Sequence, residues 1–96
     1  MISRSPHTAS IYQSDLEAGL AEGEAEMLYI ANLASSAIYT VQGVGLTIWE
    51  LLENPLGPDE LLSEITDIYG VDRETVAQAV FDFLETMAER GLLDKA

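Results

Sequence analysis

Residues 27–42 (MLYIANLASSAIYTVQ) contain the strongest β-strand signal in the chain. The runs 27–34 and 37–42 are short and contain several β-branched and aromatic residues, which favours strands over helices. Ser35 and Ser36 lie between the runs and predict a turn of a few residues. Because an isolated hairpin is only marginally stable, this one is expected to pack on other elements.

Three helices are predicted after the hairpin, and glycine or proline marks their boundaries. The first covers about 45–53, where large apolar side chains occupy two turns, and Asn54-Pro55 ends it. The second covers about 58–69 and starts on a proline, which suits a first helical position. The third covers about 72–90 and has a wide apolar surface. Strands followed by helices indicate an α+β fold.

The N-terminal part has weaker patterns. Residues 1–10 are mostly polar and show no periodicity, so we expect a flexible segment there and a single domain over 11–96. Ile11-Tyr12 is an apolar pair that either forms a strand or anchors the terminus. Residues 14–26 are acidic, contain two glycines and are expected to form a loop.

Composition excludes several classes of partner. Seventeen Asp and Glu residues oppose four Lys and Arg residues, which gives a formal net charge of −13, and no Lys or Arg lies between Arg4 and Arg73. Binding to nucleic acids or anionic membranes requires clustered basic residues, so neither partner is expected. Basic peptides would be attracted. The chain has no cysteine, no long apolar run and no apolar signal core, and we expect a cytoplasmic protein.

The residues that usually carry catalysis or bind metals are scarce or badly placed. The only histidine, His7, lies in the segment expected to be flexible. Gly43-Val44-Gly45 lacks both the third glycine of a dinucleotide-binding motif and the lysine of a phosphate loop. The acidic residues lack the spacing of a calcium-binding loop. We therefore expect no enzyme activity, no cofactor and no metal site.

Several short motifs occur in a defined order between residues 27 and 93. They are 38–45 (IYTVQGVG), 48–52 (IWELL), 60–62 (ELL), 69–72 (YGVD), 83–84 (FL) and 91–93 (GLL). This ordered set resembles the PqqD-like family, whose members are also called RiPP recognition elements. Two positions depart from the family pattern, since Gln42 replaces the usual asparagine and Val44 the usual threonine.

The resemblance implies a winged helix-turn-helix-like fold, in which a three-stranded N-terminal antiparallel sheet packs on three helices. It also implies binding of the leader segment of a ribosomally synthesised precursor peptide. The leader would join the sheet as an extra strand beside 37–42 and lie against the third helix. The bound precursor would be presented to a modifying enzyme of natural-product biosynthesis, such as a lasso-peptide protease, a cyclase or a radical-SAM protein.

The predicted peptide-binding site has two parts. The strand residues expected to pair with the leader are Ala37, Ile38, Tyr39, Thr40 and Val41. The third helix has two apolar stripes, one formed by Val76, Val80, Phe83 and Met87 and the other by Ala77, Phe81, Leu84 and Ala88. From the pattern alone, the second stripe could pack against the hairpin or line a groove. With the resemblance it is predicted to form the groove wall, so Phe81→Glu is predicted to abolish binding while leaving a folded protein.

Other functions remain open at this stage. A winged-helix DNA-binding regulator would need a basic third helix, whereas this one has only Arg73 and Arg90 at its ends. An acyl or peptidyl carrier would need an attachment serine at a helix start, and Gln13-Ser14-Asp15 does not match that motif. An acidic protein–protein adaptor is a further alternative. The free strand edge could also pair with a second copy of the chain.

Overall fold

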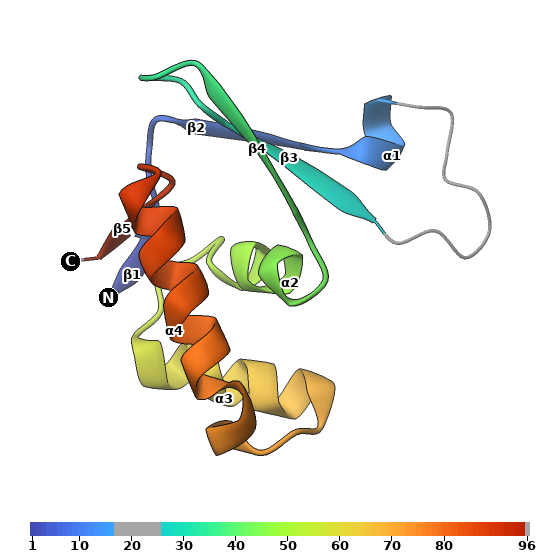
Figure 1. Cartoon of the computed structure of the whole chain (residues 1–96), viewed down its shortest axis with the longest axis vertical. Helices are drawn as coiled ribbons and strands as arrows, with labels where there is room; N and C mark the ends of the chain where they lie inside the picture. Colours follow the sequence, from blue (N-terminus) through green and yellow to red (C-terminus); the bar gives the residue numbers. More distant parts are fainter. Residues whose placement is uncertain (17–25, 96) are drawn as a thin grey trace.

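A computed structural model describes residues 1–16 and 26–95 of the chain. In Figure 1 the three-stranded sheet crosses above the three longer helices. The elements in chain order are β1 (Ile2–Arg4), β2 (Thr8–Tyr12), α1 (Gln13–Leu16), β3 (Met27–Asn32), β4 (Ala37–Gln42), α2 (Val44–Leu51), α3 (Pro58–Tyr69), α4 (Arg73–Glu89) and β5 (Leu93–Lys95). The α+β class with a three-stranded antiparallel sheet is confirmed.

The sheet has the order β2-β3-β4, and β3 pairs with β4 as the predicted hairpin. The run predicted over 27–34 ends earlier, at Asn32, because the Asn32 Oδ1 accepts hydrogen bonds from the backbone N–H groups of Ala34 and Ser35. On its other side, the Asn32 Nδ2 donates to the backbone oxygen of Arg90 over 2.8 Å. One buried amide therefore joins the hairpin turn to the end of α4.

The N-terminal residues differ from the expected flexible segment over 1–10. Strand β1 pairs antiparallel with β5, and Ile2 is only 3% exposed. The backbone of Ile2 also exchanges two hydrogen bonds with Leu56, over 2.7 and 3.0 Å. A strand of three residues is too short for periodicity to reveal, and its partner strand lies at the opposite end of the chain. The prediction overlooked this pairing because it is entirely non-local.

Strand β2 incorporates the apolar pair Ile11-Tyr12 and pairs with β3 along its whole length. The short helix α1 follows it, in the region predicted to be a loop over 14–26. The rest of that predicted loop, 17–25, lies outside the described residues. The sheet therefore has the three strands that the family resemblance implies, and β2 begins within the segment expected to be flexible.

The helices match the predicted ranges closely, with α2 shorter by two residues at its end. One hydrophobic core joins the sheet to all three of them. Its fully buried side chains include Leu28 and Ile30 of β3, Ile48 of α2, Leu61, Leu62 and Ile65 of α3, and Val80 and Met87 of α4. Within residues 1–16 and 26–95, no helix combines the length and apolar character that crossing a membrane requires.

Candidate functional site

Strand β4 forms one edge of the sheet, and no strand in the described part of the chain pairs with its outer side. Its side chains alternate, so that Tyr39 and Val41 turn towards the helices while Ile38 and Thr40 are exposed. An unpaired edge presents backbone N–H and C=O groups that can accept another strand. Residues 37–41, predicted from the sequence, therefore do lie on a free edge.

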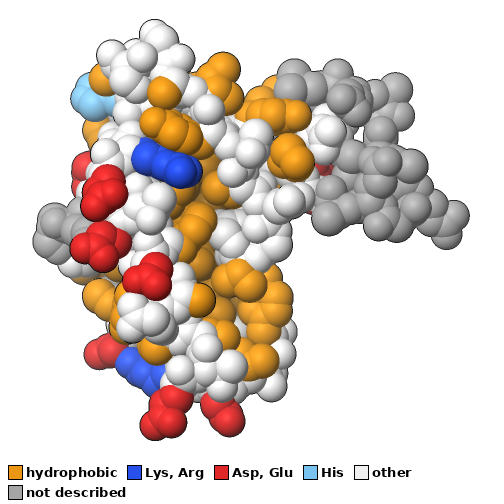
Figure 2. Space-filling view, viewed as in Figure 1, with side chains coloured by type: hydrophobic (Ala, Val, Ile, Leu, Met, Phe, Trp, Pro, Cys, Tyr) orange, Lys and Arg blue, Asp and Glu red, His pale blue; other side chains and the backbone are white. Residues whose placement is uncertain are grey.

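An apolar cleft of about 210 Å³ lies between α2 and α4, and α2 directly follows β4. Its lining includes Val44, Gly45 and Ile48 of α2 and Val76, Ala79 and Phe83 of α4. Figure 2 shows hydrophobic side chains as a strip along the side of α4 that faces β4. A peptide strand added to β4 would turn every second side chain towards this strip.

Arg90 lies where α4 ends beside the sheet. Its guanidinium carbon is 4.7 Å from the centre of the Tyr39 ring, close enough for a cation–π interaction. The structure records one ion pair between described side chains, Arg73 with Asp59, so the exposed Arg90 guanidinium remains available to a carboxylate on a ligand. The free edge and the apolar cleft thus have a positive charge at one end.

The opposite edge of the sheet, β2, has different surroundings. It borders a polar cavity of about 220 Å³ whose lining includes Arg4, Tyr12 and Glu50. Arg4 donates two hydrogen bonds to the backbone oxygen of Trp49, and Tyr12 donates one to Glu50 over 2.7 Å. The hydrogen bond to Glu50 raises the pKa of Tyr12. The polar side chains of Arg4, Tyr12 and Glu50 therefore already have hydrogen-bond partners within the protein.

The predicted groove wall lies elsewhere. Leu84 is a core residue with 3% exposure, and both Leu84 and Phe81 line a separate cavity with Ile2 and Pro58. Positions two apart on a helix point about 200° away from each other, so Phe81 faces away from the side that carries Ala79 and Phe83. Neither Phe81 nor Leu84 lines the cleft between α2 and α4. Of the other two predicted positions, Ala77 packs against the core and Ala88 is half-buried.

The sequence pattern identified some of the α4 residues that line the cleft, but assigned them to the core. Val76, Val80 and Phe83 belong to the first apolar stripe, which was expected to pack in the core. Ala79 is exposed and small, and Arg90 is a single cation at a helix end, so neither gave a signal. Phe81 and Leu84 of the stripe predicted as surplus line a cavity with Ile2 of β1, whereas Val76, Val80 and Phe83 of the other stripe line the cleft.

Substituting alanine for Gly45 is expected to lower peptide affinity by roughly tenfold, or about 1.4 kcal/mol. A Cβ at this position would lie 2.8 Å from the Phe83 Cε2, so the Phe83 ring must rotate and change the shape of the cleft. Alanine should favour helix α2 by about 1 kcal/mol. Isothermal titration with an extended peptide that binds the protein, together with thermal melting, measures both effects. An unchanged affinity would show that the cleft does not contact the peptide.

Comparisons with known proteins add to this geometry. The family model described as coenzyme PQQ synthesis protein D (PqqD) matches residues 27–93, a range that contains β4, the cleft and Arg90. The solved structure described as TbiB1 in complex with the TbiA(beta) leader peptide is similar to this chain, with a TM-score of 0.75 and 26% sequence identity. The similarity covers 98% of this chain and 96% of that one. Curated protein sequences gave no match. The chain belongs to the PqqD family.

Proposed function

We propose that this chain binds the leader segment of a ribosomally synthesised precursor peptide and presents it to a modifying enzyme, with no catalysis of its own. The observation that carries the proposal is the free β4 edge beside an apolar cleft, within the residues that match the PqqD family. The similarity to TbiB1, a protein described in complex with a leader peptide, supports it.

The proposed binding mode is strand addition at β4. Backbone hydrogen bonds to the free edge would hold an extended peptide regardless of its sequence, and alternate side chains in the cleft would select it. The edge of β2 is the weaker candidate because a polar, partly acidic cavity borders it. On the helix-facing side of the sheet, a leader side chain would meet an apolar cleft near β4 but a polar cavity near β2, and this difference favours β4 for an apolar leader.

The electrostatic part of the proposal has a local and a general component. Near Arg90, an acidic leader residue would form a charge-assisted hydrogen bond. Over the rest of the protein, a net charge of −13 favours basic residues on the leader or on the enzyme and would speed their encounter at low salt. Affinity in the range of about micromolar to nanomolar would correspond to roughly −8 to −12 kcal/mol.

The recipient of the complex belongs to the same proposal. A leader peptidase of a lasso-peptide system, a cyclase and a radical-SAM enzyme each need the precursor held by its leader while its core is modified. Helices α2–α4 with the sheet would then form a winged helix-turn-helix-like scaffold that binds peptide in place of DNA. The described basic side chains of α4 lie at its two ends, which gives a duplex no basic surface to contact along the helix.

The direct test is a titration. The leader half of the precursor peptide encoded beside this protein is labelled with a fluorophore, and its anisotropy is followed as protein is added. Saturation at micromolar concentration or below is expected. The core half of the same precursor is the matched control and should not bind. A folded protein that fails to bind the leader at high micromolar concentration would refute the proposed function.

Hydrogen exchange identifies the edge that is used. Leader binding is expected to slow the exchange of amides in β4, because those facing outward acquire hydrogen-bond partners. Amides of β2 should exchange at the same rate with and without the leader. Mass spectrometry of the free and bound protein reads out both strands in one experiment. Protection of β2 without protection of β4 would place the leader on the opposite edge.

A further inference from the structure

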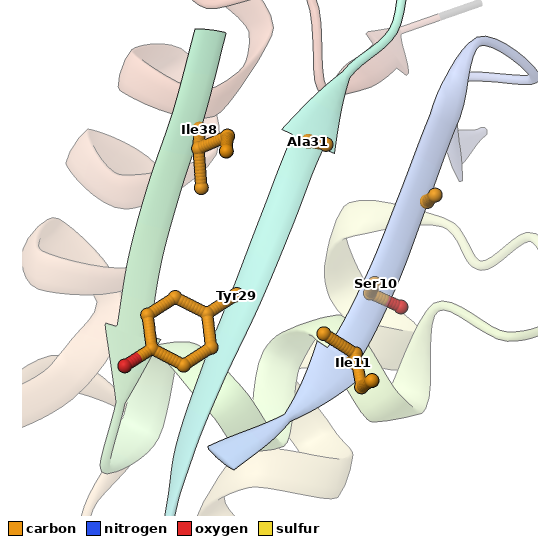
Figure 3. A pocket seen from close by; sticks show the side chains of 6 residues that line it. Ser10, Ile11, Tyr29, Ala31 and Ile38 are labelled. Carbon is orange, nitrogen blue, oxygen red and sulfur yellow. The ribbon is translucent and has the colours of Figure 1, made fainter. Parts of the chain in front are cut away.

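The sheet has an apolar face turned away from the helices. The register places Ala9, Ala31 and Ile38 in one row across the three strands and Ile11, Tyr29 and Thr40 in the next. Figure 3 shows the labelled Ile11, Tyr29, Ala31 and Ile38 on this side of the sheet, with the helices behind it. Ile38 is 69% exposed and Ile11 is 40% exposed. These six residues are called the outer face below.

The outer face differs from an ordinary solvent-facing sheet. Antiparallel sheets with one wet side usually alternate between apolar residues towards the core and polar residues towards water. Here five of the six outer-face residues are hydrophobic and none is charged, in a chain with seventeen acidic residues. Side chains of Ile11, Tyr29 and Ile38 surround a shallow hollow of about 300 Å³. A contiguous exposed apolar surface of this kind marks a contact site for another macromolecule.

We propose that the outer face is the docking surface for the modifying enzyme, and that the enzyme's contact surface is apolar with a border of Lys and Arg residues. This inference rests on the proposed function, since it assigns a surface to the recipient of the leader. The negative net charge of the chain favours a different protein over a second copy as the partner. A second copy would bring another net charge of −13 to the contact, whereas a basic border on a different protein is attracted.

The position of the outer face adds a functional consequence. A leader strand added beside β4 would continue the sheet, and half of its side chains would lie next to Ile38 and Thr40 on the outer face. The enzyme would then contact protein and leader together, while the cleft on the other side of the sheet holds the remaining leader side chains. Leader and enzyme would strengthen each other's binding by the same factor, as linkage requires.

The test separates enzyme docking from leader binding. Ile11→Lys alters the outer face on β2, the strand farthest from the proposed leader edge, and Ile68→Lys makes the same change at an exposed position of α3. The probe is the purified modifying enzyme encoded beside the precursor peptide, titrated against labelled protein with and without leader. Ile11→Lys is expected to weaken enzyme binding by at least about tenfold and to leave leader affinity unchanged. Ile68→Lys should change neither.

The outcomes are distinct. Normal leader binding with equal enzyme binding by wild type and Ile11→Lys would overturn the docking surface and leave the proposed function standing. Loss of leader binding by the wild type would refute the proposed function itself. Sedimentation that shows a dimer dissociated by Ile11→Lys, with enzyme binding intact, would assign the outer face to a second copy. Enzyme binding that does not weaken as salt is added would contradict the basic border.

Discussion

Replacing Ala79 with glutamate is expected to reduce leader affinity by at least a hundredfold, about 2.7 kcal/mol or more. Ala79 is exposed and lines the cleft between α2 and α4, so the longer side chain extends into the space proposed for a leader side chain. Binding would bury the new carboxylate among apolar groups, which is costly without a partner. Because the position is exposed and glutamate is a good helix former, the fold should be retained.

Phe81→Glu is the matched control for Ala79→Glu. Both variants add one negative charge to the same helix, two positions apart, and Phe81 lies on the side of α4 that meets Ile2 and Pro58. Phe81→Glu should keep leader affinity within a few fold, which replaces the expectation drawn from sequence alone. Anisotropy titration of both variants measures leader affinity, and circular dichroism checks that both are folded. The cleft assignment fails if Phe81→Glu loses binding while Ala79→Glu retains it.

Replacing Ile2 with alanine is expected to destabilise the fold by about 2–4 kcal/mol. Ile2 is 3% exposed, packs in the hydrophobic core and lies in β1, so truncation leaves a cavity between β1, α3 and α4. For a domain of this size each kcal/mol lowers Tm by roughly 4–8 °C. A loss of this size is a large part of the total stability expected for a small domain, about 5–15 kcal/mol.

Ile68→Ala removes the same atoms from an exposed site on α3, where the side chain is 54% exposed. It should change stability by no more than about 0.5 kcal/mol, because surface substitutions away from special features have small effects. Urea unfolding of both variants measures the contrast. Equal stability of Ile2→Ala and wild type would show that β1 contributes nothing to the fold and that the N-terminal segment behaves as the sequence suggested.

The local features of the fold could be predicted from sequence. The hairpin and the helices are encoded by short-range patterns, namely β-branched residues in 37–42 and glycine or proline at helix ends. These patterns depend only on residues that are close in sequence, so they can be recognised without knowing which other elements pack against the strand or helix. The expectation that 37–42 forms the free edge came from the family resemblance, which implies an added leader strand beside it.

The long-range features could not be predicted in the same way. Strand β1 pairs with β5 over three residues, and nothing in 1–10 indicates a partner near residue 94. Without β1, the stripe with Phe81 and Leu84 has no visible packing partner, and the sequence therefore favours a groove there. The fold instead places Ile2 against that stripe and leaves the side with Ala79 and Phe83 towards the cleft. The groove wall predicted from sequence and the proposed cleft wall therefore lie on different sides of α4.

Asn32 determines how rigid the proposed groove is. Its amide joins the hairpin turn to the end of α4. At the opposite end of β4, the chain continues into α2, which lines the cleft and packs in the hydrophobic core. Both walls are thus fixed when the chain folds, so the site is preorganised and little of its conformational entropy is left to lose on binding. In the proposed binding mode, most of the ordering cost would then fall on the leader, which would become extended on a site whose walls are already in place.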